Sequence, residues 1–194
     1  MVIIRPAIII VDVLNDFVTG ELGIKRAESI IAPLQHLVDA AHKMMVPVIF
    51  SNDAHYLQDV EVTRKWGQHA MKGSYGAEVI SELTPDLTKD YIVEKRTYSG
   101  FYETGLDSLL RNLYDGEGVK TVVLCGLHTH MCVRHTGADA FFRGYYIIVA
   151  SDGTEAFTAQ HHKNGLRYLK NVYGAKILTV NEIIEDLSKM LTTS

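Results

Sequence analysis

Six short apolar runs, separated by segments with helical spacing, constrain the fold of this chain more than any other feature. A short and nearly continuous apolar run is typical of a strand that is buried on both faces. Strands that alternate with helices form a parallel sheet with helices on both faces. The sequence therefore predicts an α/β fold, a three-layer sandwich whose six strands cover Ala7–Val13, Val46–Phe50, Tyr91–Val93, Val119–Cys125, Tyr146–Ala150 and Lys176–Val180.

Apolar residues recur at helical spacing between these runs, first from about Ala32 to Met45. Residues 56–75 are instead polar, irregular and long for a connection, which makes them a candidate functional loop. Asn181 is expected to cap a last helix that ends near Met190. The other expected helices cover Ala77–Leu83, Leu106–Leu113, His130–Phe142 and Thr158–Val172.

The length of 194 residues, without a linker or a repeat, predicts a single domain over residues 1–194. A hydrophobic share of 47% and a charged share of 22% are typical of a soluble globular protein. The net charge of −4 and the lack of a basic cluster argue against a nucleic-acid partner. No apolar run reaches the roughly 18 residues of a membrane span, so we expect no membrane partner.

The chain has two cysteines, and their positions predict different roles. Cys125 lies inside a predicted strand and is expected to be an inert core residue. Cys132 follows Gly126 and a polar turn in which Thr129 can cap the next helix, so it falls in the first helical turn. Unpaired N–H groups and the helix dipole favour a thiolate there, which makes Cys132 a candidate nucleophile. Two cysteines cannot form a framework of disulfides, and this usage fits a reducing cytoplasm.

Polar residues follow the carboxyl ends of the predicted strands. Asp12 ends the first strand, Lys95 follows the third, and Cys132 comes after the fourth. Ligands of an open parallel sheet bind outside these ends, where the strand order reverses. With the order 3-2-1-4-5-6, that point lies between strands one and four. Asp12 and Cys132 are then expected to face each other.

These residues suggest a hydrolytic mechanism. Asp12 could accept the thiol proton of Cys132 and later deliver it to a leaving amine, if burial raises its pKa. The Lys95 ammonium would stabilise the thiolate or the carboxylate. Backbone N–H groups around Met131 and Cys132 could bind the oxyanion. Each residue alone also has a structural interpretation, as a strand end, a surface lysine or a buried thiol, so the hypothesis depends on their convergence.

Asp53, His55 and His69 form a second candidate cluster. Asp53 and His55 point the same way in an extended segment, and His69 would complete a site with two imidazoles and one carboxylate. Such a site suits Zn²⁺, Fe²⁺ or Mn²⁺. His128 and His130 crowd the turn before Cys132 and could line the pocket. His161 and His162 are expected on a solvated helix surface.

Five segments in one order cover most of the chain. They are Ile9–Phe17 with Asp12, Asp53-x-His55, Trp66-x-x-His69 with Gly73-Ser-x-Gly76-Ala-Glu78, Lys95-x-x-Tyr98-Ser-x-Phe101, and Gly126-Leu-x-Thr129-x-x-Cys132-Val-x-x-Thr136-x-x-Asp139-Ala140. Together they resemble the isochorismatase-like cysteine hydrolases, and most closely the nicotinamidases and the proteins related to N-carbamoylsarcosine amidase.

This resemblance implies a six-stranded parallel sheet, an Asp12–Lys95–Cys132 triad and a homo-oligomer. It also implies a cis peptide between Leu127 and His128 that directs the amides of the turn at the oxyanion. Asp53, His55 and His69 would hold a divalent metal, with Zn²⁺ the first choice, that ligates the ring nitrogen of nicotinamide. Phe17 would line the ring pocket.

The sequence departs from the nicotinamidase pattern where a substrate would be selected. Ala54 replaces a tryptophan, and His128 and His130 replace small and acidic residues. True isochorismatases lack the cysteine, so Cys132 argues against that activity. We therefore expect a cytoplasmic amidohydrolase with nicotinamide as the leading substrate and an N-carbamoyl or ureido amide as the alternative. A non-catalytic binding or scaffold protein on the same fold is the alternative of another class.

Overall fold

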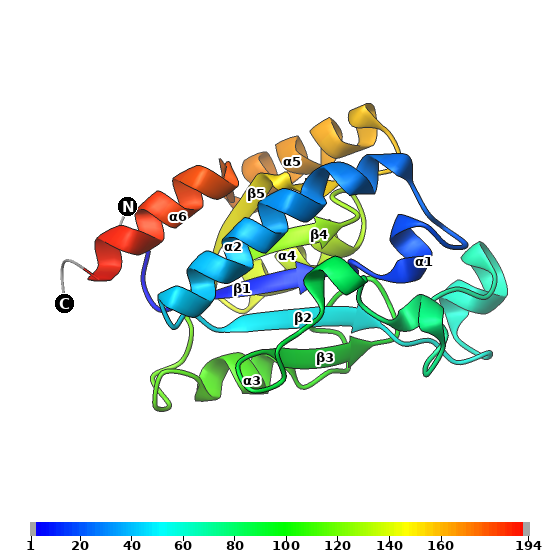
Figure 1. Ribbon diagram of the computed structural model, residues 1–194, viewed down its shortest axis with the longest axis horizontal. Coiled ribbons are helices and arrows are strands. Elements are labelled where there is room, and N and C mark those ends of the chain that lie inside the picture. Colours follow the sequence, from blue (N-terminus) through cyan, green and yellow to red (C-terminus); the bar gives the residue numbers. More distant parts are fainter. Residues whose placement is uncertain (1–2, 192–194) are drawn as a thin grey trace.

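A computed structural model describes residues 3–191 of the chain. Its centre is one six-stranded parallel sheet in the order β3-β2-β1-β4-β5-β6 (Figure 1). The predicted α/β fold and strand order are confirmed, and they place the switch point between β1 and β4. The strands are β1 (Pro6–Val11), β2 (Val48–Asp53), β3 (Tyr91–Lys95), β4 (Thr121–Leu127), β5 (Tyr146–Glu155) and β6 (Lys176–Leu178).

Helices cover both faces of the sheet. Helices α2 (Ile31–Lys43) and α6 (Val180–Leu191) pack on one face, where Ile8 and Ile10 of β1 point. Helices α3 (Leu106–Asn112), α4 (Cys132–Phe142) and α5 (Ala159–Tyr173) cover the other face, which receives Ile9 and Val11. The apolar run of β1 is continuous because successive side chains enter two different cores.

The carboxyl ends of β1, β2 and β3 point toward the edge where α1 (Asn15–Val18) and residues 56–75 lie (Figure 1). The predicted functional loop contains a π-helix, η2 (Val62–Trp66), and is followed by the 3-10 helix η3 (Tyr75–Ala77). A further 3-10 helix that the pattern did not predict, η1 (Lys25–Ile30), precedes α2. None of the helices within residues 3–191 combines the length and the apolar character that crossing a membrane requires.

The expected helix over Ala77–Leu83 is wrong. The segment contains the end of η3 and the 3-10 helix η4 (Ser81–Leu83), with extended backbone between them. Val79 forms an antiparallel bridge with Leu14, and the N–H of Ile80 donates to the Val13 carbonyl at 3.2 Å. These tertiary hydrogen bonds replace the ones that a continuous helix would make.

Other element boundaries also differ from the sequence-based expectation, and β5 and α6 show the physical reasons most clearly. Strand β5 continues past Ala150 to Glu155, because a shift in register lets Thr154 and Glu155 pair with Gly126 and Leu127 of β4. Helix α6 is not capped by Asn181. The Thr179 hydroxyl accepts the N–H of Glu182 at 3.3 Å, and the Glu182 carboxylate accepts the N–H of Thr179 at 2.7 Å, which is a capping box that begins two residues earlier.

Candidate active site

Asp12, Lys95 and Cys132 meet at the carboxyl edge of the sheet. They come from the residue after β1, the last residue of β3 and the first residue of α4. The Lys95 ammonium lies 2.7 Å from the Asp12 carboxylate, and the Cys132 sulfur lies within 4.8 Å of an Asp12 oxygen. All three residues are buried, with at most 4% of their surface exposed. The structure therefore brings together three residues that are far apart in sequence.

The backbone at Asp12 is in the left-handed region, with φ 52°, which a residue with a Cβ rarely adopts. Two hydrogen bonds hold it against the end of β2. The Asp12 N–H donates to the Ser51 carbonyl at 3.1 Å, and its carboxylate accepts the N–H of Asp53 at 2.8 Å. The turn after β1 thereby directs the carboxylate toward Lys95 and Cys132.

Gly126 allows the turn before Cys132 to lie close to Asp12. Its φ is +96°, and an added Cβ would overlap the backbone carbonyl of Val11. Only glycine fits this close approach of β4 to β1. The next peptide bond, between Leu127 and His128, is cis, as the family resemblance implies.

Burial dominates the protonation states of this cluster. It raises the pKa of Asp12 to about 7, helped by the charge of Asp53 and opposed by Lys95. Burial also raises the pKa of the Cys132 thiol well above its usual value, and Lys95 offsets only part of this effect. The expected bias toward thiolate is therefore wrong for the resting site, because the sequence showed a helix start but not the depth of burial. The pKa of Lys95 is raised, since the charges of Asp12 and Asp53 outweigh the effect of burial.

The backbone donors of the turn are not all free. The N–H of Met131 donates to the His128 carbonyl at 2.9 Å, so the expected oxyanion contact from Met131 is wrong for this conformation. Thr129 does not cap α4, because its hydroxyl contacts the Glu155 carbonyl and the ring of His162. Within residues 3–191, the N–H of Cys132 has no hydrogen-bond acceptor. This N–H, at the first turn of α4, is available to donate to an oxyanion.

Asp53, His55 and His69 converge next to the cysteine, and a fourth residue, Glu61, joins them. One donor atom from each of the four lies within 4.8 Å of the others. The Nε2 atom of His55 and the Oε1 atom of Glu61 are buried without a hydrogen-bond partner within the described chain. Two imidazoles and two carboxylates, of which His55 and Glu61 each have a buried ligand atom without a hydrogen-bond partner among the described residues, fit a transition-metal ion such as Zn²⁺.

Neighbouring groups orient the two histidine rings. Nδ1 of His69 lies 2.8 Å from the Gly67 carbonyl, which can only accept, so Nδ1 carries the proton and Nε2 is free to bind a metal. Burial lowers the pKa of His69, which keeps the ring in the neutral form that binds metals. Nδ1 of His55 lies 3.3 Å from the carboxylate of Asp59.

Glu61 and Asp59 were both missed by the sequence analysis. The available signal was their position in residues 56–75, the irregular segment that was singled out as a functional loop. Spacing alone could not assign them, because a turn at Tyr56–Asp59 and the π-helix that follows decide which acids face inward.

A small aromatic cavity lies above Cys132. Phe17 and His128 line it as expected, with their ring centroids 5.8 Å apart, and Phe157 stacks on His128 at 4.2 Å. No arginine or lysine is among the described residues that line it. The remaining lining residues are Leu22, Asp53, Glu61, Trp66, His69, Tyr98, Met131 and Cys132.

His130 does not reach this cavity, so its expected place in the substrate pocket is wrong. Its ring stacks on His161 at 4.4 Å and lines a surface groove beside α4 and α5. The ring of His130 lies 5.8 Å from that of Phe157 and 6.3 Å from that of His128, and of these three rings only Phe157 and His128 line the cavity. His162 is half-buried against Thr129, whereas His161 is exposed as expected.

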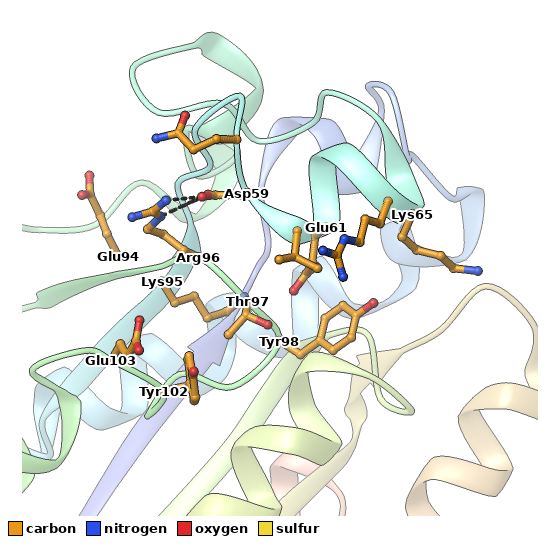
Figure 2. Close-up of a pocket in the computed structure, with 13 residues that line it drawn as sticks. Asp59, Glu61, Lys65, Glu94, Lys95, Arg96, Thr97, Tyr98, Tyr102 and Glu103 are labelled. Atoms are coloured by element: carbon orange, nitrogen blue, oxygen red, sulfur yellow. Dashed lines mark hydrogen bonds and ion pairs between the residues drawn. The ribbon is translucent and has the colours of Figure 1, made fainter.

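A larger hollow of about 730 Å³ adjoins the cavity (Figure 2). Glu61 and Tyr98 line both spaces, so they form the partition between them. The indole N–H of Trp66 donates to the Tyr98 hydroxyl at 3.1 Å and ties the π-helix to the segment after β3. Figure 2 shows Arg96 and Asp59 paired on the wall of this hollow, next to Lys95.

Comparisons with known proteins identify the family of this chain and agree with its fold. A family model for the isochorismatase domain matches residues 6–182. The solved N-carbamoylsarcosine amidase of Thermoplasma acidophilum is 41% identical, with a TM-score of 0.83 over 91% of this chain and 97% of that one. The pyrazinamidase of Pyrococcus horikoshii in complex with zinc is 27% identical, with a TM-score of 0.80 over 91% and 99%. The ureidoacrylate amidohydrolase RutB of Acinetobacter baylyi is 27% identical over 88% of this chain and 79% of its own length.

Proposed function

Because this chain belongs to the isochorismatase family, we propose that it is a cysteine-dependent amidohydrolase that releases ammonia from a small amide. The observation that carries the proposal is the buried cluster at the switch point of the sheet, in which Asp12 pairs with Lys95 and lies within 4.8 Å of the Cys132 sulfur. A nucleophile, a proton acceptor and a fixed positive charge are the groups that acyl transfer from an amide requires.

In the first half of the proposed reaction, the Cys132 sulfur attacks the amide carbonyl while Asp12 takes the thiol proton. A pKa of about 7 lets Asp12 both accept and return a proton near neutral pH. The N–H of Cys132 donates to the oxyanion. The carbon–nitrogen bond then breaks, and Asp12 delivers its proton to the leaving nitrogen. Ammonia departs, and the acyl group remains bound to Cys132 as a thioester.

Water resolves the thioester in the second half. Asp12 accepts one proton of the attacking water, the carbon–sulfur bond breaks, and the sulfur regains the proton from Asp12. The products are a carboxylic acid and the free thiol. Lys95 keeps its positive charge throughout, because the Asp12 and Asp53 carboxylates hold its pKa far above neutrality.

We further propose that Asp53, His55, Glu61 and His69 hold a divalent metal, with Zn²⁺ preferred to Fe²⁺ or Mn²⁺. The mixed nitrogen and oxygen donor set supports this choice. The zinc complex of the pyrazinamidase relative also supports it. When bound, such an ion would supply a Lewis-acid position that can ligate a ring nitrogen of the substrate.

Nicotinamide is the substrate that this cavity supports best. The cavity holds about 10 Å³ in this conformation, so its walls must move apart to admit a substrate. Phe17, His128 and Phe157 would then offer aromatic faces to a flat pyridine ring. An anionic substrate would find no arginine or lysine among the described residues of the lining. An N-carbamoyl amide is the second candidate, favoured by the 41% identity to the N-carbamoylsarcosine amidase.

The test is an ammonia-release screen of nicotinamide, pyrazinamide, N-carbamoylsarcosine and ureidoacrylate. We expect turnover of nicotinamide and pyrazinamide to exceed that of the two ureido acids. Faster turnover of the two ureido acids would contradict nicotinamide as the substrate and favour a carbamoyl amide, and the proposed hydrolase chemistry would still hold. Protein that releases no ammonia from any of the four, yet binds a protein partner, would support the scaffold alternative.

We also propose a cytoplasmic homo-oligomer. Both cysteines are free, as expected in a reducing compartment. The exposed rings of Phe141 and Phe142 cluster with the partly buried ring of Tyr173 at the ends of α4 and α5, and Phe142 is 71% exposed. Exposed aromatic patches of this kind are typical of subunit contacts, and light scattering of the purified protein tests the assembly.

A further inference from the structure

Asp59 connects the candidate metal site to an arginine on the surface. Its carboxylate lies 3.3 Å from Nδ1 of His55, on the side of the ring that faces away from Asp53. Only 4% of the Asp59 side chain is exposed, and the His55 side chain is fully buried. A buried carboxylate against one ring nitrogen leaves the other nitrogen, Nε2, directed at the remaining donors.

Arg96 and the local turn hold Asp59 in place. The Arg96 guanidinium donates to both carboxylate oxygens, with Nε 3.0 and 3.1 Å away and a further contact from Nη2. The backbone N–H of Tyr56 donates to the same carboxylate at 2.9 Å. A two-pronged arginine contact fixes the plane of a carboxylate as well as its position.

The end of β3 supplies two successive cations that serve different carboxylates. Lys95 points inward to Asp12 and Asp53, whereas Arg96 points to Asp59 on the wall of the hollow in Figure 2. Lys95 is the last residue of β3, and Arg96 is the first residue after the strand. Arg96 also lies over the ring of Tyr56 at 4.9 Å, and about half of its side chain is exposed.

We propose that Asp59, held by Arg96, is a positioning residue that fixes the ring orientation and proton position of His55 and thereby sets the metal affinity of the site. This inference rests on the proposed metal site. A carboxylate that accepts the Nδ1 proton leaves a lone pair on Nε2, where a metal would bind. It also holds the ring in the plane that points Nε2 toward Glu61 and His69.

The test measures Zn²⁺ affinity of the metal-free protein by competition with a chromophoric chelator. Asp59→Asn can still accept at one oxygen but loses the charge and the two-pronged contact, and we expect the affinity to fall by about 10- to 100-fold. Arg96→Gln, a change at a half-exposed residue that the fold should tolerate, is expected to weaken binding in the same direction. Asp86→Asn is the matched control, because this half-buried aspartate pairs with its sequence neighbours Thr88 and Lys89.

Two further readouts separate positioning from general damage. The metal-free Asp59→Asn protein should unfold within a few degrees of the metal-free parent, and saturating Zn²⁺ should restore most of kcat. Equal Zn²⁺ affinity in the Asp59→Asn variant and the parent would overturn the inference. A parent protein that binds no Zn²⁺ would instead reject the proposed metal site, so the two failures are distinguishable.

Discussion

At the scale of single residues, Asp12 shows how placement creates reactivity. Its left-handed backbone and its raised pKa both follow from its position directly after a central strand, between two other strand ends. Strained backbone conformations persist where the surrounding structure holds them, and they cluster at functional sites. The carboxylate is thereby buried beside a thiol whose own pKa burial raises, so the thiol is protonated at rest.

The first prediction concerns the pH dependence of the reaction. Only the ionised carboxylate can accept the thiol proton, so kcat/KM should rise with pH and level off above the Asp12 pKa of about 7. Below that pKa we expect a decline of about tenfold per pH unit. Ammonia release measured between pH 5 and pH 9 provides the profile. A flat profile from pH 5 to pH 8 would exclude Asp12 as the proton acceptor.

The second prediction compares the two cysteines. Cys132→Ala removes the nucleophile and should lower kcat by several orders of magnitude. Cys125→Ala is the matched control, because Cys125 is equally buried but packs in the core on the other side of the sheet. Its activity should stay within a few-fold of the parent. Ammonia release that survives in the Cys132 variant would contradict the mechanism.

At the scale of elements, the contact between β1 and β4 builds the site. Ile10 lies opposite Cys125 and Val11 opposite Gly126 in the parallel register, so the residue after β1 is next to the turn that leads into α4. Residues 56–75 then close the site from the other side, with the π-helix supporting Trp66 against Tyr98. Two strand ends and one irregular segment thus enclose the thiol.

The third prediction tests the close approach at Gly126. Gly126→Ala places a methyl group on the Val11 carbonyl and should lower the free energy of unfolding by about 4 kcal/mol or more. Gly144→Ala is the control, because Gly144 has a similar φ of +83° but open space around it. The free energy of unfolding of the control should fall by only about 1–2 kcal/mol, which is the cost of placing a residue with a Cβ in the left-handed region. Urea unfolding of both variants gives the comparison, and equal losses would refute the steric argument.

At the scale of the whole molecule, the sheet order places the catalytic cluster and the candidate metal site side by side. Asp53 belongs to both, since it contacts Lys95 and lies within 4.8 Å of the Cys132 sulfur and of the His55 and His69 rings. A metal ion and the thiol would therefore act on the same small molecule.

The fourth prediction concerns metal removal. A ligand that binds only the folded state stabilises it, by about 2.7 kcal/mol at 100 times its Kd. Chelation should therefore lower Tm and depress nicotinamide turnover, and added Zn²⁺ should restore both. Mg²⁺ should not, because it prefers all-oxygen octahedral sites. Full nicotinamide turnover in metal-free protein would reject the role of the metal.

Most of the fold could be predicted from local pattern, because strand and helix periodicities are properties of short segments. The failures lie where distant segments compete with local preference. Residues 77–83 do not form the expected helix, because their backbone makes hydrogen bonds with the turn after β1. Strand β5 is longer than expected, because Thr154 and Glu155 pair with β4. No local pattern contains those partners.

The sequence by itself determined the alternation of strands and helices, the family resemblance and which residues stand at the strand ends. Only the tertiary structure decided the charge state of Cys132, the inward position of Glu61 and the exclusion of His130 from the cavity. The physical reason is that a pKa depends on burial and on charges brought together from three strands. The position of the His130 ring outside the cavity likewise depends on packing against other elements, here Phe157 and His161 of α5.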